Sequence, residues 1–280
     1  MTEQTMAGRT VLVTGASDGI GAEAARVLAA QGATVHVTGR SADKLRPVAE
    51  AVGTEPLVAD FSRLDDVRHL AKLVAERVGS LDLLLNNAGG TFSPAQRTHD
   101  GHEPNLQVNH LAPFLLTHLL RPSLAAASGS LVVNTSSIAN LLGRVVLDDL
   151  DYERRRAIEF PAYGTGKLMN ILFTRGITQR WADDAIRSVA VHPGPVGSSF
   201  GRDSFLVGLL YRTPLKRFAT ITVADGAAPL VALAHRGPDP EIDGRYFSRF
   251  KIDGRENRQA HDQGLIDGLW ERSEALVGLP

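Results

Sequence analysis

Short apolar stretches alternate along this chain with longer stretches in which apolar residues recur at helical spacing. The short stretches predict strands at Thr10–Thr14, Ala33–Thr38, Pro56–Ala59, Leu81–Asn86, Ser130–Asn134, Ile186–Val191 and Arg245–Phe247. The longer stretches predict helices at Gly19–Gln31, Ser41–Val52, Leu64–Val78, Gln107–Leu120 and Tyr163–Trp181. Pro113 lies inside the fourth helix and is expected to bend it or adjust it locally.

This alternation of strands and helices predicts βαβ units and therefore the α/β fold class. We expect residues 1–280 to form a single doubly wound Rossmann-type domain, with a central parallel sheet of about seven strands flanked by helices. Residues 138–162 form an insertion before the helix at Tyr163. Its charged runs, Asp148–Asp151 and Arg154–Arg156, are expected to face solvent.

Composition narrows the function classes. The net charge of −1 gives no general attraction to nucleic acid, and the chain has no cysteine for a disulfide, a thiolate metal site or a cysteine nucleophile. No apolar run reaches the roughly 18 residues needed to span a bilayer. Met1–Arg9 also lacks the apolar core of a signal peptide, so a cytoplasmic protein is expected. His99 and His102 lack the His-Glu-x-x-His pattern, which predicts a polar loop and no metal site.

A glycine-rich turn follows the first predicted strand. Gly15, Gly19 and Gly21 permit tight backbone geometry and the close approach of a ligand, and the helix that follows offers N–H groups to a pyrophosphate. Their spacing, Gly-x-x-x-Gly-x-Gly, differs from the common Gly-x-Gly-x-x-Gly of dinucleotide-binding turns. No Gly-Lys-Ser/Thr ending follows, which argues against a nucleotide triphosphatase loop.

The end of the second predicted strand bears on the choice of cofactor. A carboxylate there would bind the ribose 2′-hydroxyl of NAD, but this chain has Gly39 and Arg40. A guanidinium can pair with the 2′-phosphate of NADP. Asp43 lies at the start of the next helix, where a role in the first turn fits better. NADP is therefore favoured, with NAD as the alternative.

Three further motifs follow in order. Asn87-Ala88-Gly89 ends the fourth strand, Asn134-Thr135-Ser136-Ser137 ends the fifth, and Tyr163 and Lys167 stand four residues apart in the helix after it. That helical spacing places the phenol and the ammonium on one face. Any one of these motifs is common, but their order along one chain indicates hydride transfer with a nicotinamide cofactor.

Taken together, these motifs resemble those of the short-chain dehydrogenase/reductase family. The resemblance implies catalytic roles for Asn109, Ser137, Tyr163 and Lys167. It also implies that the cofactor contacts Gly15, Ser17, Asp18, Gly19, Ile20, Gly21, Arg40, Asp60, Phe61, Asn87, Ala88, Gly89, Tyr163, Lys167, Pro193, Gly194, Val196 and Ser198. A homodimer or homotetramer is expected on the same ground.

The retinol-dehydrogenase-like branch fits better than the rest of the family. The stretches that carry this likeness are Asp100–Leu111, Lys167–Thr174 and Leu269–Glu274. The step of 26 residues from Ser137 to Tyr163 also fits, since most compact members have a shorter one. Gly166 stands where many members have serine. The membrane-anchoring segment of animal retinol dehydrogenases is not found, so a retinoid substrate is not implied.

The expected chemistry is the interconversion of a carbonyl and an alcohol. A tyrosine pKa is ordinarily about 10, and a nearby cation such as Lys167 favours the phenolate, which suits Tyr163 to acid/base work. Ser137 would bind the substrate oxygen and stabilise developing charge. By resemblance, Lys167 would also reach the ribose hydroxyls, and Asn109 would hold a water that links Lys167 to solvent.

The apolar stretch after the sixth strand bears on the substrate. Residues 198–220 would overhang the carboxyl ends of the strands as a lid, and their apolar side chains suggest a hydrophobic carbonyl or alcohol. A subunit contact, a plain amphipathic helix or membrane-surface docking are the other interpretations of this segment. Two other functions stay open: a non-catalytic NADP-binding sensor or scaffold, and a sugar-nucleotide epimerase or dehydratase.

Overall fold

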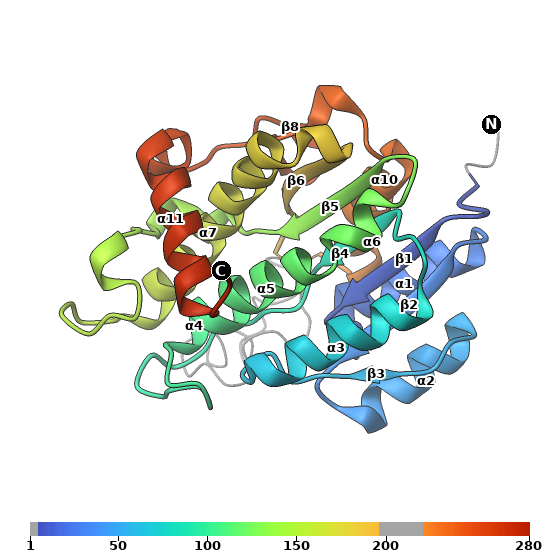
Figure 1. The fold of residues 1–280 in the computed structure, drawn as a ribbon, viewed down its shortest axis with the longest axis horizontal. Coiled ribbons are helices and arrows are strands. Elements are labelled where there is room, and N and C mark those ends of the chain that lie inside the picture. The colour runs from blue at the N-terminus through green and yellow to red at the C-terminus, as the bar shows by residue number, and fades with distance from the viewer. Residues whose placement is uncertain (1–4, 196–220) are drawn as a thin grey trace.

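The computed structural model describes residues 5–195 and 221–280, which form one α/β domain around an eight-stranded sheet (Figure 1). The strands are β1 (Thr10–Thr14), β2 (Thr34–Gly39), β3 (Leu57–Val58), β4 (Leu83–Asn86), β5 (Ser130–Thr135), β6 (Ile186–His192), β7 (Tyr246–Ser248) and β8 (Lys251–Ile252). Their order across the sheet is β3-β2-β1-β4-β5-β6-β7-β8. The predicted doubly wound sheet is therefore confirmed.

All neighbouring strands are parallel except β7 and β8, which form an antiparallel pair. Strand β8 is the one strand of this sheet that the sequence pattern did not predict. It has only two residues and follows β7 through a tight turn in which Arg249 has a φ of 57°. A strand of two residues is too short to show the alternation of apolar and polar positions from which strands are predicted.

The longer helices follow the predicted alternation. They are α1 (Gly19–Ala30), α2 (Ala42–Val52), α3 (Leu64–Arg77), α5 (Ala112–Leu119), α6 (Arg121–Ala125), α7 (Glu159–Arg180), α10 (Val223–Arg236) and α11 (Gln263–Leu276). Helices α6, α10 and α11 were not predicted, and α7 begins at Glu159, before the predicted start at Tyr163 and within the expected insertion 138–162. Pro229 interrupts the pattern of α10, and Gly264 and Gly268 lie within α11. Tertiary packing overrides these weak local signals.

The predicted helix over 107–120 is composite. It begins with α4 (Pro104–Leu106), continues as a π-helical turn η1 (Gln107–Leu111) and then runs into α5. The Ala112 N–H donates to the carbonyl of Gln107, five residues back. Pro113 has no N–H and cannot donate the α-helical bond to the carbonyl of Asn109. The predicted local adjustment at Pro113 is thus confirmed.

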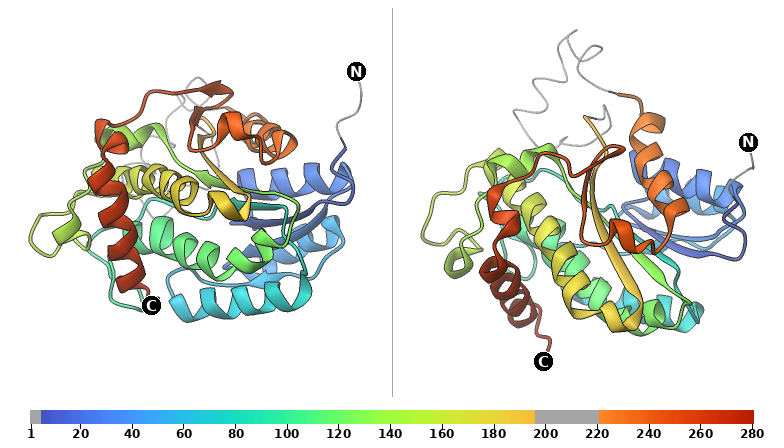
Figure 2. Two further views of the ribbon diagram at one scale, coloured as in Figure 1. Left: turned by 45° about the horizontal axis from the view of Figure 1, so that its top comes forward. Right: turned by 90° about the horizontal axis from the view of Figure 1, so that it is seen from above.

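Two apolar cores lie on opposite faces of the sheet. One packs α3, α5, α7 and α11 against residues such as Leu12, Leu84 and Val132. The other packs α1, α2 and α10 against their strand neighbours, such as Val13 and Val133. Alternate residues of a strand point to opposite faces, so β1, β4, β5, β6 and β7 each contribute to both cores. Figure 2 shows the two helical layers on either side of the sheet.

Short helices complete the chain. They are η2 (Ile138–Leu142), η3 (Leu147–Asp149), η4 (Ala182–Asp184), η5 (Pro240–Ile242) and η6 (Arg258–His261). No helix in the described ranges is long and apolar enough to cross a membrane.

The charged runs of the segment 138–162 are not uniformly solvated. Asp148 is exposed, but Asp149 is only 6% exposed. Its carboxylate accepts from the backbone N–H groups of Glu153, Arg154 and Arg155, and these bonds hold its pKa below the ordinary value. The expectation that the whole acidic run faces solvent is therefore wrong at Asp149. The backbone of the loop turns around this carboxylate and donates hydrogen bonds to it.

Candidate active site

Helix α7 carries both members of the predicted catalytic pair. Tyr163 is 5% exposed and Lys167 is 2% exposed, and the Lys167 Nζ lies 5.7 Å from the centre of the Tyr163 ring. The Nζ donates to the carbonyl oxygen of Thr135, at the end of β5, over 3.1 Å. Burial lowers the pKa of Lys167 to about 7. The lysine is therefore poised to exchange a proton near neutral pH.

Glycines set the position of α7 against its neighbours. A Cβ on Gly164 would lie 2.3 Å from the carbonyl oxygen of Ala139 in η2. A Cβ on Gly166 would lie 2.7 Å from the carbonyl oxygen of Asn105 and 3.2 Å from the Asn109 Cβ. A serine at Gly166 would not fit here without movement. These contacts fix the distance between the Tyr163 helix and the Asn109 turn.

The two serines after β5 have different partners. The Ser136 hydroxyl is buried and donates to the Lys167 carbonyl over 2.8 Å, which ties the strand to α7. The Ser137 hydroxyl caps η2 by accepting from the Ala139 N–H at 3.2 Å, and its residue is only partly buried. Ser137 is thus the less buried of the two serines, and its role toward a ligand stays a prediction.

Asn109 lies in the π-helical turn and is fully buried. Its side chain accepts from the Gly90 N–H at 3.0 Å and donates to the Gly90 carbonyl at 2.9 Å. A Cβ on Gly89 would lie 2.4 Å from the Asn109 Oδ1 and 3.0 Å from the Lys167 Nζ. The structure therefore brings Asn109, Lys167 and the loop after β4 together around the α-carbon of Gly89.

The glycine turn after β1 is packed directly on the loop after β4. Gly15 has a φ of 66°, and a Cβ there would lie 2.7 Å from the Ala88 Cα. A Cβ on Gly21 would lie 2.5 Å from the Asn87 Nδ2, which donates to the Thr14 carbonyl at 3.0 Å. Only glycine allows these approaches.

The start of α1 and the end of β2 meet beside this turn. The Asp18 carboxylate caps α1 by accepting from the Gly19 N–H at 2.7 Å. The Ser17 hydroxyl lies 2.0 Å from the position that a Cβ on Gly39 would take. This hydroxyl is buried and has no hydrogen-bond partner among the described residues. Arg40 is exposed, and it forms no ion pair within residues 5–195 and 221–280.

Asp60 and Phe61 lie in the turn after β3. The Asp60 carboxylate accepts from the Ser62 N–H at 2.9 Å, and the Asp60 N–H donates to Asp66 at 3.0 Å. Phe61 is 6% exposed, and its carbonyl accepts from the Gln107 side chain at 3.2 Å. The Phe61 ring belongs to the apolar core, so a ligand could reach this residue mainly through its backbone.

The segment after β6 is described only in part. Gly194 has a φ of 108° and follows Pro193 at the carboxyl end of the strand. The Ile221 N–H donates to the Pro195 carbonyl at 2.9 Å, which joins the residues after β6 to those before α10. Val196, Ser198 and the expected lid over 198–220 lie outside the described residues.

A comparison with protein-family models decides the family. The model for the short chain dehydrogenase family matches residues 9–205, which is most of the chain. The chain belongs to the short-chain dehydrogenase/reductase family. The resemblance on which the sequence prediction rested is therefore confirmed, and with it the assignment as an enzyme of this class.

Curated relatives of this short-chain dehydrogenase cover nearly its whole length. "Putative daunorubicin C-13 ketoreductase DnrU" of Streptomyces sp. (strain C5) is 40% identical and covers 97% of this chain and 93% of its own. Retinol dehydrogenase 12 of Homo sapiens is 37% identical and covers 97% and 87%. A crystal structure of an uncharacterized protein from Mycobacterium paratuberculosis has a TM-score of 0.76 and 32% identity, and it covers 98% and 95%. These relatives place the chain in the retinol-dehydrogenase-like branch.

The residues present fit the nicotinamide nucleotide that this family uses. A polar hydroxyl buried without a partner is costly unless a ligand satisfies it, and Ser17 has such a hydroxyl beside Arg40. The backbone approaches at Gly15 and Gly21 leave no side chains at the start of α1, where a pyrophosphate binds well.

Sequence reasoning missed the role of Thr14. Its hydroxyl accepts from the N–H groups of Asn87 and Ala88, at 3.0 and 2.9 Å, and donates to the Leu85 carbonyl at 3.2 Å. This single hydroxyl joins the end of β1 to the loop after β4. In the sequence, the position of Thr14 directly before Gly15 of the glycine turn could have indicated this role.

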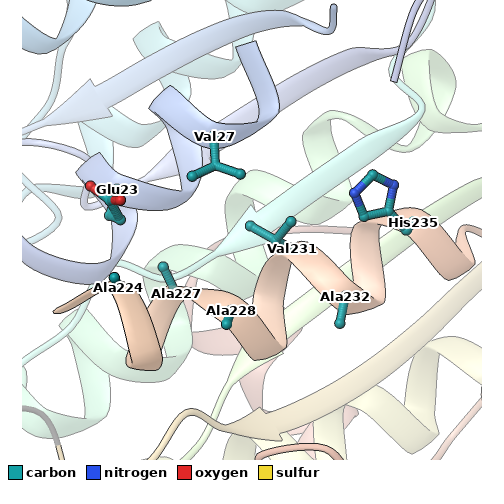
Figure 3. Close-up of a pocket in the computed structure, with 8 residues that line it drawn as sticks. All are labelled: Glu23, Val27, Ala224, Ala227, Ala228, Val231, Ala232 and His235. Carbon is teal, nitrogen blue, oxygen red and sulfur yellow. The ribbon is translucent and has the colours of Figure 1, made fainter. Parts of the chain in front are cut away.

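A shallow pocket lies apart from this site, between α1 and α10 (Figure 3). Its lining residues are Glu23, Val27, Ala224, Ala227, Ala228, Val231, Ala232 and His235. None of them belongs to the motifs singled out in the sequence, and nothing in the structure indicates what would fill it.

Proposed function

We propose that this enzyme is an NADP-dependent oxidoreductase that interconverts a carbonyl and an alcohol on a hydrophobic small molecule. The observation that carries the proposal is the buried pair Tyr163 and Lys167 on α7, whose lysine is held by the Thr135 carbonyl at the end of β5, two residues before Ser137. The glycine turn and Arg40 lie at the carboxyl ends of strands in the same sheet. Ligands of open α/β sheets bind at that edge.

The nucleotide half of the site favours NADP over NAD. Arg40 stands at the end of β2, where a carboxylate would select NAD, and its exposed guanidinium has no protein carboxylate to neutralise it in the described chain. The buried Ser17 hydroxyl lies beside the same strand end. Together they offer a charge-assisted pair and a hydrogen bond to a 2′-phosphate.

When bound, the nicotinamide supplies the hydride for reduction or accepts it in oxidation. Tyr163 gives a proton to the carbonyl oxygen in reduction and takes it back in oxidation. Its phenolate is favoured by the Lys167 ammonium, whose Nζ lies near the Tyr163 ring. Burial lowers the pKa of Lys167 to about 7, so the lysine can gain or lose its proton near neutral pH. The charge that favours the phenolate changes with that proton.

The groups around the pair orient the substrate and restore the proton. The Ser137 hydroxyl donates to the substrate oxygen and stabilises the charge that develops there. The Asn109 side chain and the Lys167 Nζ lie around the α-carbon of Gly89, so Asn109 stands beside the lysine. From there Asn109 would hold a water that links Lys167 to solvent.

The surroundings of Tyr163 favour an apolar substrate. The Phe160 ring lies 6.0 Å from the Tyr163 ring and is 42% exposed. Ile138, directly after Ser137, is 44% exposed, and Ile158 is 60% exposed. Large apolar side chains left exposed in a group mark a binding surface. The names of the relatives, a daunorubicin C-13 ketoreductase and retinol dehydrogenases, fit the same class of substrate.

The test is nicotinamide absorbance with purified protein, NADPH and NADH in parallel, and a panel of aryl ketones, aldehydes and cyclic alcohols. Tyr163→Phe should lower turnover at least a hundredfold, as loss of a general acid does, while NADPH binding stays within threefold. Tyr152→Phe is the matched control, because the Tyr152 hydroxyl donates to Thr165 at 2.8 Å and has no role in the proposed chemistry. Near-normal turnover by Tyr163→Phe would contradict the assignment.

A second outcome would favour another function. NADPH binding without Tyr163-dependent turnover on any substrate of the panel would support a non-catalytic NADP-binding sensor or scaffold. Turnover of a nucleotide sugar without net change in nicotinamide absorbance would support an epimerase instead.

A further inference from the structure

The short helix η2, which begins directly after Ser137, is attached to the C-terminal part of the chain. Asn140, in the middle of η2, is fully buried. Its Oδ1 accepts from the backbone N–H of Asn257 at 2.9 Å. Its Nδ2 donates to the Ser137 carbonyl at 2.8 Å and to the Tyr246 hydroxyl at 3.3 Å. Each polar atom of this buried amide therefore has a partner, and segments far apart in the chain meet at it.

The partners fix which way the Asn140 amide points. A backbone N–H can only donate, so the Asn140 atom that faces the Asn257 N–H must be the oxygen. The amide nitrogen then faces the Ser137 carbonyl, which can only accept. One orientation of the amide satisfies both neighbours, and the reverse orientation would satisfy neither.

The Asn257 side chain strengthens the same attachment. Its Nδ2 donates to the carbonyl of Asn140 at 3.2 Å and to that of Gly143, just after η2, at 2.8 Å. Its Oδ1 accepts from the Gln259 N–H at 3.0 Å, which fixes the orientation of this amide as well. Both ends of the loop that η2 opens are therefore bonded to one asparagine of the C-terminal segment.

These bonds act directly on Ser137. The Ser137 carbonyl accepts from the backbone N–H of Asn140 at 3.0 Å and from its Nδ2 at 2.8 Å, so the peptide plane after the serine is held by two donors. The Ala139 N–H donates to the Ser137 hydroxyl oxygen at 3.2 Å. This bond uses the hydroxyl oxygen as an acceptor and leaves its proton for a substrate oxygen.

We propose that Asn140, held by Asn257, is a positioning residue that keeps the Ser137 hydroxyl in place for the substrate oxygen. This inference rests on the proposed function, because that function gives Ser137 its role toward the carbonyl. A donor stabilises developing charge best when it is in place before the reaction, and a loosely held η2 would weaken it. Asn257 thereby supports the catalytic serine, although it lies 117 residues after Asn140 in the chain.

Hydrogen exchange tests the attachment without nucleotide or turnover. Asn140→Leu nearly keeps the side-chain volume and removes all three side-chain hydrogen bonds. Peptides that cover residues 138–145 should exchange about tenfold faster in this variant than in the wild type, while peptides that cover β6 should not change. Unchanged exchange over 138–145 would overturn the proposal, since η2 would then be held without Asn140.

A double-mutant cycle tests whether Asn140 acts through Ser137. Ser137→Ala should lower kcat/KM for the carbonyl about a hundredfold, as loss of a preorganised donor does. Asn140→Leu should lower it about tenfold by misplacing that donor, with the KM for NADPH within about twofold. In the Ser137→Ala background, Asn140→Leu should cost less than about twofold, because the hydroxyl that it positions is already gone. Losses that multiply to about a thousandfold would mean that Asn140 acts independently of Ser137, and the proposal would fail.

Gln259→Leu is the matched control. The Gln259 side chain pairs with the N–H and the carbonyl of Val145, at 2.9 and 3.0 Å, and makes no bond to Ser137 or Asn140. The variant should lose stability in urea as Asn140→Leu does, but its kcat/KM should stay within about twofold of the wild type. Equal losses of kcat/KM in the two variants would show that any weakening of this loop slows the reaction, and this would overturn the specific role of Asn140.

Asn257→Ala is a milder variant for the case in which Asn140→Leu does not fold. It keeps the backbone N–H that donates to Asn140 and loses the side-chain bonds to η2 and Gly143. It should speed exchange over 138–145 and lower kcat/KM about threefold, and wild-type values in both would overturn the proposal. Absence of Tyr163-dependent turnover in the wild type would instead refute the proposed function, and hydrogen exchange would still decide whether Asn140 holds η2.

Discussion

The two halves of the site are held in different ways. In the catalytic half, where β5 meets α7, the chain itself holds the functional groups. The Lys167 ammonium donates to Thr135, the Asn109 amide pairs with Gly90, and Ser136 joins the strand to the helix. In the nucleotide half, at the ends of β1 and β2, the Ser17 hydroxyl is buried without a partner in the described chain. The Arg40 guanidinium there is exposed and has no carboxylate partner in the described chain.

This difference separates the tasks of the two halves. A catalytic group must be in place before the reaction, so its hydrogen bonds are made within the protein. A binding group contributes most when its hydrogen bonds are left for the ligand, since those bonds then count toward affinity. Substitutions in the first half should therefore change kcat or stability, and those in the second should change KM for the nucleotide.

Among substitutions that leave the catalytic side chains in place, the largest effect is expected from Gly166→Ala in the catalytic half. The added Cβ would lie 2.7 Å from the Asn105 carbonyl oxygen, so α7 must move away from the Asn109 turn. A misplacement of about 1 Å can cost about a hundredfold, and kcat should fall between tenfold and a hundredfold while the KM for NADPH stays within threefold. Steady-state kinetics at saturating NADPH would show this.

Gly79→Ala is the control for that experiment, because a Cβ on Gly79 meets nothing within 4 Å. It should leave kcat unchanged. If Gly166→Ala also turned over at the wild-type rate, the close packing of α7 would not be what sets the catalytic geometry.

The next effect in size is expected from Arg40→Asp in the nucleotide half. Loss of a charge-assisted bond and repulsion of the 2′-phosphate should raise the KM for NADPH about 30-fold and lower that for NADH, with kcat within twofold. Arg46→Asp, on the exposed side of α2, is the matched control. Equal changes in the two variants would mean that net charge, and not a contact to the phosphate, decides the preference.

The sequence predicted those features of the fold and of the site that depend on a local pattern of residues. Alternating strands and helices defined the sheet, and spacing placed Tyr163 and Lys167 on one face. It could not show that Ser136 would be occupied by the Lys167 carbonyl, or that Asp149 would be buried, because both depend on which segments far apart in the chain come together. The unpredicted α10 and β8 were too weak in pattern to be found. The roles of Asn109, Ser137 and the nucleotide contacts stay predictions.

Acid should weaken the fold in part through His110. The pKa of His110 is lowered to about 3 by burial, so the folded protein keeps this ring neutral while the unfolded chain, with a pKa of about 6.5, binds a proton. The stabilisation is complete above about pH 6.5 and is lost as pH falls toward 3. Between pH 7.5 and 5.5 this group should cost about 1.4 kcal/mol, a tenfold change in the folding equilibrium. Urea unfolding of the wild type and His110→Phe at both pH values would measure it as a difference that grows with acid. A difference independent of pH would show that the ring titrates normally in the fold.

The smallest effect is expected from a serine-to-alanine substitution, made at Ser136 in the catalytic half and at Ser17 in the nucleotide half. Ser136→Ala removes the hydrogen bond to the Lys167 carbonyl, and it should lower the free energy of unfolding by about 1 kcal/mol. Ser17→Ala removes a hydroxyl that has no partner in the described chain, so it should leave stability unchanged or slightly improved. It should nevertheless raise the KM for NADPH about threefold. Urea unfolding without nucleotide, together with kinetics, would measure both variants.

If Ser17→Ala destabilised the protein as much as Ser136→Ala and left the KM unchanged, Ser17 would be a structural residue like its counterpart. The two halves would then be held in the same way.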